Sequence, residues 1–263
     1  MAAGRADARS SLISDTQIEG RHPVREALRA GRPLRKLLVA RTAARTAGLR
    51  HLIGEARRRG IPVQEVDAAV LERLARTRTP QGIIAVAAAH ATVELDDVLA
   101  RSRGRAEAPL LLMLDGIEDP GNLGAILRSA DAAGVHGVVI PRRRAAGLSA
   151  AVAATSAGAI EHVLVAQVAN LTAAIERLKA EGIWVIGADP GASDDLYNVS
   201  LLPPVALVVG SEGRGLSRLV RERCDRLVRI PMYGATASLN ASVAAALCLF
   251  EVRRQMRAAT GSP

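Results

Sequence analysis

Aromatic residues and cysteines are scarce in this sequence of 263 residues. Phe, Trp and Tyr together make up 2% of the chain, so the hydrophobic core must be built from Ala, Val, Leu and Ile. The two cysteines, Cys224 and Cys248, lie far apart and form no C-x-x-C pair. The pattern favours neither a disulfide framework nor a thiolate metal site, and it fits a reducing cytoplasm.

Several common signatures are also missing. No run of about 20 apolar residues is present, so we expect neither a membrane-spanning helix nor a membrane partner. Residues 1–15 lack the apolar core of a signal peptide and are predicted to form a disordered tail. No G-x-G-x-x-G follows a strand, so a conventional dinucleotide-binding fold is not supported, and no P-loop is present. The five histidines do not cluster as metal ligands do, so no metal is expected.

Positive charge is abundant. The formal net charge is +9, which favours a polyanionic partner, and nucleic acid over a membrane surface. An arginine-rich composition without a specific partner is the alternative.

The pattern of apolar runs and turns predicts two α/β domains. Helices and strands alternate over residues 16–92, which form a small α/β unit. Residues 93–108 mix acids and arginines and are predicted to be a linker. In residues 109–263, strands again alternate with helices, which predicts a parallel sheet with right-handed crossovers.

Two groups of arginines are candidate RNA contacts. The small domain is rich in arginine, with Arg21 near its start, and arginines that share one face would follow RNA phosphates. Arg142, Arg143 and Arg144 follow a predicted strand at the sheet edge where ligands bind. In both places the alternative is a solvated surface.

The C-terminal stretch contains the features typical of an α/β ligand site. A buried strand over residues 205–209 ends at Gly210, and two more glycines follow within five residues. A second short strand, 227–230, stops at Pro231. A buried helix then begins at Ala241, where Ser238 or Asn240 is placed to cap it. Two ordinary turns and a capped helix are the simpler interpretation.

Three motifs together resemble those of the SpoU (TrmH) family of RNA ribose 2′-O-methyltransferases in the SPOUT superfamily. They are Asp119-Pro-Gly-Asn-Leu-Gly124 with Arg128, then Gly210-Ser-Glu-Gly-Arg-Gly-Leu216, then Ile230-Pro-Met232 with Ser238-Leu-Asn240. In addition, Glu19-Gly-Arg-His-Pro-Val24 and Gln81-Gly-Ile83 resemble the L30e-like RNA-binding domain of the RlmB-like subgroup. The resemblance therefore covers nearly the whole chain.

The resemblance implies a specific fold and activity. The fold is an α/β parallel-sheet SPOUT domain with a C-terminal trefoil knot, preceded by a small L30e-like domain. The protein would be a cytoplasmic homodimer that uses S-adenosylmethionine, without a metal, to methylate structured RNA. A guanosine of large-subunit (23S) ribosomal RNA is the expected target. A tRNA enzyme, a resistance methyltransferase acting on an adenosine of the same ribosomal RNA, and a non-catalytic RNA-binding module are the alternatives.

The same resemblance implies which residues form the site. Those at the family's polar site positions are Asn122, Arg128, Glu212, Ser238 and Asn240. Those expected to hold the methyl donor are Val209, Gly210, Ser211, Gly213, Ile230, Pro231, Met232, Ser238 and Leu239. Because a guanidinium stays protonated, Arg128 is expected to clamp phosphate or stabilise a developing alkoxide, while phosphate or Glu212 takes the proton. Relatives often carry larger residues at Gly121 and Ala241, and neither departure touches the polar set.

Overall fold

The computed structural model describes residues 15–88, 90–236 and 238–260, which divide into two compact units. The smaller unit comprises the chain up to Ala91 together with Leu148–His162, and the larger unit comprises Thr92–Gly147 and Val163–Pro263. The predicted tail, residues 1–15, lies outside the described residues except for Asp15, the first residue of β1.

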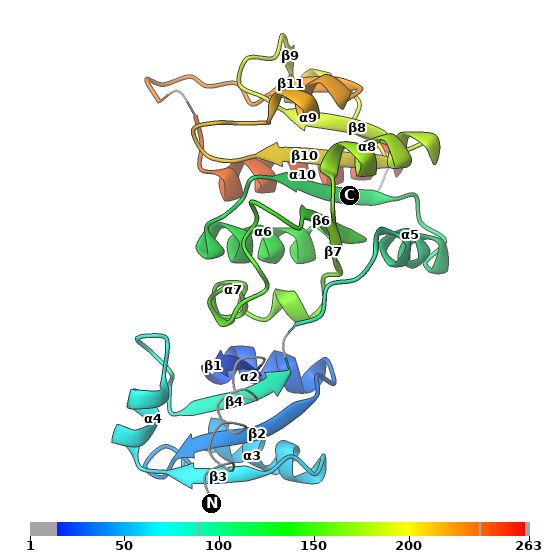
Figure 1. The fold of residues 1–263 in the computed structure, drawn as a ribbon. Helices are drawn as coiled ribbons and strands as arrows, with labels where there is room; N and C mark the ends of the chain where they lie inside the picture. Colours follow the sequence, from blue (N-terminus) through cyan, green and yellow to red (C-terminus); the bar gives the residue numbers. More distant parts are fainter. Residues whose placement is uncertain (1–14, 89, 237, 261–263) are drawn as a thin grey trace, which may run out of the picture. The chain divides into compact units, whose positions relative to one another are not determined.

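A four-stranded sheet forms the centre of the smaller unit (Figure 1). Its strand order is β1-β4-β2-β3, in which β2 and β3 are parallel and the other pairs antiparallel. The elements are β1 (Asp15–Glu19), α2 (Arg21–Arg29), β2 (Leu34–Ala40), α3 (Ala47–Arg58), β3 (Val63–Val66), α4 (Ala68–Leu74) and β4 (Ile83–Ala88).

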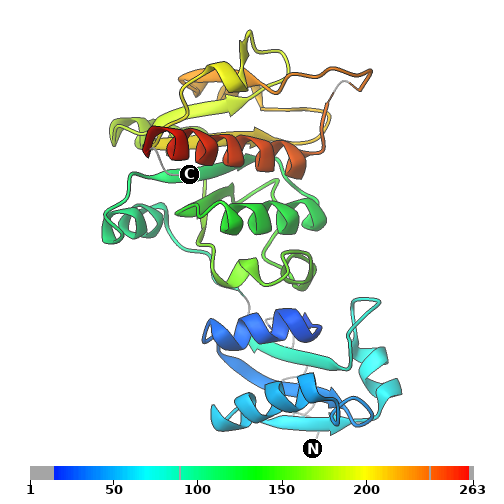
Figure 2. The same cartoon turned by 180° about the vertical axis from the view of Figure 1, so that it is seen from behind.

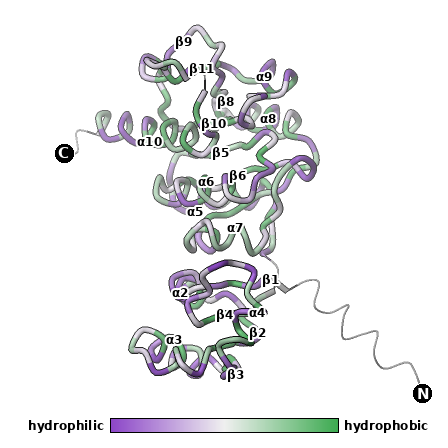
Figure 3. The backbone as a smooth tube through the Cα atoms, turned by 90° about the vertical axis from the view of Figure 1, so that its left-hand side faces the viewer, coloured by the Kyte–Doolittle hydropathy of each residue, from purple (hydrophilic) through white to green (hydrophobic). Residues whose placement is uncertain are grey.

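Alternation along the strands gives this sheet two covered faces. Leu37 and Val39 on β2 pack with the apolar sides of α2 and α3. Leu38 and Ala40 face the other way and pack with Leu71 of α4. Figure 3 shows hydrophobic residues along β2 and β4, with hydrophilic stretches on the outer side of α3. The two faces follow from the two-residue period of a strand.

Residues 148–162 belong to the smaller unit although they lie within the predicted second domain. They form α7 (Ala150–Thr155) and the short helix η1 (Ala159–Glu161). In η1, Glu161 forms an ion pair with Arg32 at 2.6 Å, and both side chains are buried. Nearby, Gly158 lies directly against Glu26 of α2, where a Cβ atom would come within 2.6 Å of that side chain.

The larger unit is a seven-stranded sheet in which every pair of neighbouring strands is parallel. The strand order is β7-β6-β5-β10-β8-β11-β9. The strands are β5 (Leu110–Asp115), β6 (Gly137–Pro141), β7 (Val165–Val168), β8 (Trp184–Ala188), β9 (Asp194–Asp195), β10 (Val205–Gly210) and β11 (Arg226–Arg229). The parallel sheet predicted from the strand–helix alternation is confirmed.

Helices cover both faces of the large sheet. They are α5 (Leu95–Gly104), α6 (Pro120–Ala132), α8 (Leu171–Ala180), α9 (Arg218–Arg223) and α10 (Ala241–Thr260), with η2 (Leu196–Asn198) between β9 and β10. Apolar residues of α5, α8 and α9 share one core with the strands. The other two helices, α6 and α10, pack against each other on the opposite face, toward the viewer in Figure 2.

The segment predicted as a linker, residues 93–108, contains α5. A capping box formed by Glu94 and Asp97 starts this helix, and Val98 and Leu99 lie in the core of the larger unit. These residues of the segment therefore belong to the folded core of the larger unit. The exact boundaries of the two domains remain a prediction from the sequence.

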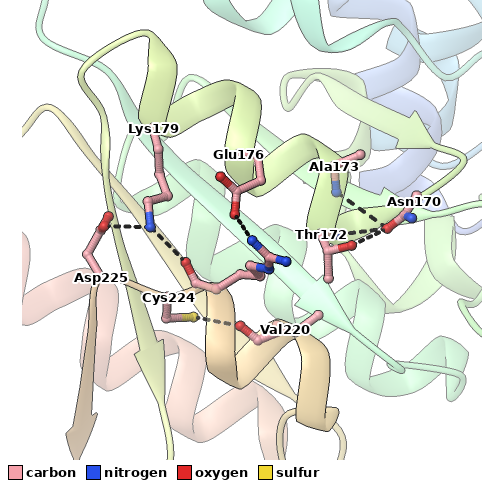
Figure 4. Close-up of polar contacts among 9 residues, drawn as sticks. Asn170, Thr172, Ala173, Glu176, Lys179, Val220, Cys224 and Asp225 are labelled. Carbon is pink, nitrogen blue, oxygen red and sulfur yellow. Dashed lines mark hydrogen bonds and ion pairs between the residues drawn. The ribbon is translucent and has the colours of Figure 1, made fainter.

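Polar contacts hold α8 and α9 together beside β11 (Figure 4). The Lys179 ammonium bonds the Asp225 carboxylate at 2.8 Å and the Arg223 carbonyl at 3.1 Å. Arg223 pairs with Glu176 at 3.1 Å, and Asn170 caps α8 by accepting from the amide of Thr172. Asp225 also accepts from the Val185 amide at 2.8 Å, which ties this group to β8. The contacts fix the position of α9 relative to the strand ends.

Candidate functional site

The carboxyl ends of four neighbouring strands meet at one edge of the large sheet. In the strand register, Gly210 of β10 lies opposite Asp115 of β5, and Val209 lies opposite Ala188 of β8. Val228 of β11 pairs with the same Ala188. In open parallel sheets this edge is where ligands bind.

A tight glycine-rich turn follows β10. The Gly215 amide donates to the Ser211 carbonyl at 2.9 Å, and Gly213 and Gly215 have φ values of +82° and +65°. A Cβ atom on Gly210 would lie 2.1 Å from the Gly215 backbone, so only glycine fits there. Asp115 accepts from the Ser217 amide at 2.6 Å and so joins this turn to the end of β5. The amide groups of Gly213 and Arg214 donate to no described residue and stay free for a ligand.

A cavity of about 630 Å³ opens beside this turn. Its volume is in the range of small-molecule and cofactor sites. Of the nine residues predicted to hold the methyl donor, Pro231 alone does not line the cavity. The eight that line it are Val209, Gly210, Ser211, Gly213, Ile230, Met232, Ser238 and Leu239.

Sequence reasoning missed the contribution of β8 and α9 to this cavity. Asp189 and Pro190, which follow β8, line it together with Arg218 and Arg221 of α9. Asp189 pairs with Arg221 at 3.1 Å. The signal was present, because a polar turn directly after a buried strand of a parallel sheet lies at the ligand-binding edge.

Three of the predicted polar residues form a hydrogen-bonded cluster at the start of α10. The Asn240 amide nitrogen donates to Asn122 Oδ1 at 2.9 Å and to Glu212 Oε2 at 3.0 Å. Its oxygen accepts from the Ser242 amide at 2.9 Å, so Asn240 caps the helix, as one of the two predicted caps. A single side chain thus joins all three motifs and also starts α10.

Helix α6 positions Asn122 and Arg128. Asp119 caps this helix by accepting from the Asn122 amide at 2.7 Å, and Pro120 occupies its first position, as predicted. Arg128 lies exposed two turns further along and forms no ion pair with any described residue. A purely structural salt bridge is the alternative to a role of Arg128 in the site, and it has no partner among the described residues. None of Asn122, Arg128 and Asn240 lines the cavity itself.

The two groups of candidate RNA-binding arginines lie in different units. Arg142, Arg143 and Arg144 are exposed at the carboxyl end of β6, and Arg144 has a φ of +58°. Arg21 is half-buried at the first turn of α2 in the smaller unit. None of the four forms an ion pair within the described part of the chain.

Neither cysteine is placed for chemistry. Burial raises the pKa of both thiols, Cys224 and Cys248, to about 12, so both are protonated at neutral pH. Among the described residues, no group of three or more His, Cys, Asp or Glu side chains is arranged to hold a metal ion. Within the same residues, no helix is long and apolar enough to cross a membrane.

The fold and site define an RNA methyltransferase. The model of the SpoU rRNA Methylase family matches residues 109–250. The model for RNA 2′-O ribose methyltransferase substrate binding matches residues 17–93. The chain therefore belongs to the SpoU (TrmH) family of RNA 2′-O-ribose methyltransferases, as its motifs predicted.

Sequence and structural similarity to individual relatives supports this family assignment. The chain is 46% identical over 236 residues to the putative TrmH family tRNA/rRNA methyltransferase YacO of Bacillus subtilis, covering 90% of this chain and 94% of the relative. An AdoMet-bound rRNA methyltransferase from Sinorhizobium meliloti is 26% identical with a TM-score of 0.76, covering 95% of this chain and 91% of that one. The A. aeolicus TrmH/SpoU tRNA modifying enzyme is 29% identical with a TM-score of 0.53, covering 59% of this chain and 78% of that one.

Proposed function

We propose that this protein methylates the 2′-hydroxyl of a guanosine in large-subunit (23S) ribosomal RNA, with S-adenosylmethionine as the donor. The observation that carries the choice of substrate is the pair of units in one chain. The Sinorhizobium rRNA methyltransferase matches 95% of the chain, whereas the tRNA modifying enzyme matches 59%. The substrate-binding family model covers residues 17–93 in addition to the methylase region.

The cavity beside β10 fits the proposed donor. Ile230, Met232 and Leu239 give it apolar walls suited to an adenine ring, and the free amides of the glycine-rich turn are donors for polar atoms. The Sinorhizobium relative was crystallised with AdoMet bound. When bound, S-adenosylmethionine supplies a methyl group on a cationic sulfur, which needs no metal for activation.

The chain's own residues then have to orient the ribose and remove one proton. The exposed guanidinium of Arg128 can clamp a neighbouring phosphate and stabilise negative charge developing on the 2′-oxygen. The Glu212 carboxylate lines the cavity and is held by Asn240, so it can accept the proton, as the phosphate could. Asn122 fixes the Asn240 amide from the side of α6.

Methyl transfer to separate RNA pools tests this proposal. Tritiated S-adenosylmethionine is incubated with the protein and unmodified large-subunit rRNA, small-subunit rRNA or tRNA. Label should enter the large-subunit pool and protect one linkage, 3′ to a guanosine, against alkali. Label in the tRNA pool alone would overturn the choice of substrate. Absence of donor binding by calorimetry would favour a non-catalytic RNA-binding module.

The homodimer implied by the family resemblance has a candidate interface on α10. Val243, Leu247 and Phe250 lie at helical spacing and are 46%, 37% and 50% exposed. Such an apolar stripe is typical of an interface. Since Ala241 and Ala244 of the same helix line the cavity, dimerisation here would place the site near the interface.

Light scattering tests this interface. We expect the parent protein to have twice the chain mass, and Phe250→Glu to shift the mass toward that of one chain. A dimeric Phe250→Glu variant would contradict the assignment.

The cytoplasmic location and the trefoil knot stay predictions.

A further inference from the structure

The smaller unit contains a buried carboxylate that is satisfied by a loop instead of a cation. Glu19, at the end of β1, is 5% exposed. Its two oxygens accept from the backbone amides of Arg76 at 2.7 Å and Thr77 at 2.9 Å, and from the Thr77 hydroxyl. A buried charge is costly unless hydrogen bonds satisfy it. Among the residues that the structure describes, every donor to the Glu19 carboxylate except Gln17 lies in the loop between α4 and β4.

The neighbouring residues of the same segment hold both ends of this loop, residues 75–82. Gln17 donates to the Leu74 carbonyl at 2.8 Å, just before the loop. At the other end, the Arg21 amide donates to Gln81 Oε1 at 3.0 Å, and the Arg21 Nε donates to the Gln81 carbonyl at 3.4 Å. Gln81 and Gly82 both have positive φ, which turns the chain into β4. Residues 17–21 therefore hold the loop at both ends and at Arg76 and Thr77.

The arginine side chains of the loop have no carboxylate partner among the described residues. Residues 73–82 contain three arginines and no acidic residue, and Arg76 and Arg78 are exposed. Together with Arg21, these two form no ion pair with any described residue. By contrast, Arg32, Arg41 and Arg59 of the same unit are each paired with a carboxylate.

We propose that loop 75–82 and Arg21 form a phosphate-binding surface for the RNA substrate, and that Glu19 is the residue that positions it. This inference rests on the proposed function and names the part of the smaller unit that contacts RNA. The Nε of Arg21 is bonded to the loop, which leaves its terminal nitrogens for a phosphate. The loop contains no aromatic residue, so contact is by charge and shape instead of base stacking.

Salt-dependent binding of the full-length protein tests the surface. The probe is unmodified, in vitro transcribed large-subunit rRNA, and the dissociation constant is measured between about 50 and 200 mM salt. Removing one arginine that binds a phosphate reduces the slope of log K against log salt by roughly one. The double variant R76A/R78A should therefore lower the slope by about two and weaken binding by about tenfold or more near physiological salt.

The matched control is R57A/R58A. These two arginines are exposed at the end of α3, which packs on the opposite face of the small sheet from α4. The control variant should keep the parental affinity and slope. Parental affinity and slope in R76A/R78A would overturn the proposed surface, as would an equal reduction in both double variants.

The role of Glu19 has its own readout in limited proteolysis. Trypsin cleaves after arginine, so a loosened loop in Glu19→Gln should be cut faster after Arg76 and Arg78, and RNA affinity should fall with it. Thr77→Val removes only the hydroxyl bond and serves as the milder variant if Glu19→Gln does not fold. Unchanged cleavage and affinity in a folded variant would overturn the positioning role.

Failure of the loop proposal can be distinguished from failure of the proposed function. Donor binding by calorimetry should be the same in the parent, R76A/R78A and Glu19→Gln, because the donor cavity lies in the larger unit. A parent protein that transfers no methyl group refutes the catalytic proposal, while the RNA-binding comparison still decides the loop.

Discussion

At the scale of single residues, Arg128 carries the clearest prediction. Its guanidinium is exposed and unpaired within the described chain, and it lies outside the donor cavity. Arg128→Ala should therefore abolish methyl transfer and leave the dissociation constant for S-adenosylmethionine within about twofold of the parent, because the substitution removes a charge-assisted bond to RNA and none to the donor. Arg257→Ala, an exposed arginine of α10, is the control. Donor binding that falls in step with transfer would contradict the assigned role.

Asn240 separates stability from chemistry at a second position. Asn240→Ser keeps an oxygen to cap α10, but its shorter side chain cannot make the bonds to both Asn122 and Glu212. We expect methyl transfer to fall at least about tenfold, with a free energy of unfolding close to that of the parent. Asn240→Ala should lose the same activity and about 1 kcal/mol of stability besides. Urea unfolding and single-turnover transfer measure the two quantities, and a fully active Asn240→Ser would refute a role for the cluster.

At the scale of elements, the turn after β10 distinguishes two kinds of glycine. A methyl group on Gly210 would meet backbone at 2.1 Å, whereas nothing lies within 4 Å of one on Gly213. Gly210→Ala should thus distort the turn and reduce donor affinity by about a hundredfold or more. Gly213→Ala keeps its space but strains a φ of +82°, which costs about 1–2 kcal/mol of stability. Calorimetry measures the donor affinity of each variant, and urea unfolding measures its stability. Equal losses of affinity and of stability in the two variants would refute this distinction.

How far the sequence predicted these elements depended on whether a local signal existed. Asp119 and Pro120 predicted the start of α6, and the β-branched run before Gly210 predicted β10, because capping and strand preference are local. The two-residue strand β9 has no such signal. The Asn122–Asn240 bond joins residues 118 positions apart, so only the fold brings them together.

At the scale of the whole molecule, stability should depend on pH through His136. This side chain is buried, accepts from the Leu110 amide at 3.0 Å and contacts Glu107 at 3.1 Å. Burial lowers its pKa below the ordinary value of 6.5, although Glu107 partly offsets the effect. As pH falls, His136 is therefore protonated at a higher pH in the unfolded chain than in the folded protein. The contribution of neutral His136 to the free energy of unfolding is complete above pH 6.5 and is lost as pH falls toward the folded-state pKa.

Urea unfolding at pH 7.5 and 5.5 measures this dependence. The free energy of unfolding should be higher at pH 7.5, by at most about 1.4 kcal/mol from His136, because only one pH unit separates 5.5 from the ordinary pKa of 6.5. His136→Asn keeps an acceptor for the Leu110 amide and removes the titration, so the difference should shrink. An unchanged difference in the variant would assign the pH dependence to other groups.

The assignment of residues 148–162 to the smaller unit has a consequence for how this architecture can be rearranged. The chain passes between the two units at three places, after Ala91, after Gly147 and after His162. A cut at residue 92 would therefore separate this segment from its partners in the smaller unit, among them Arg32, which pairs with the buried Glu161. Recombination between relatives can exchange the smaller unit intact only if residues 148–162 are exchanged together with residues 1–91.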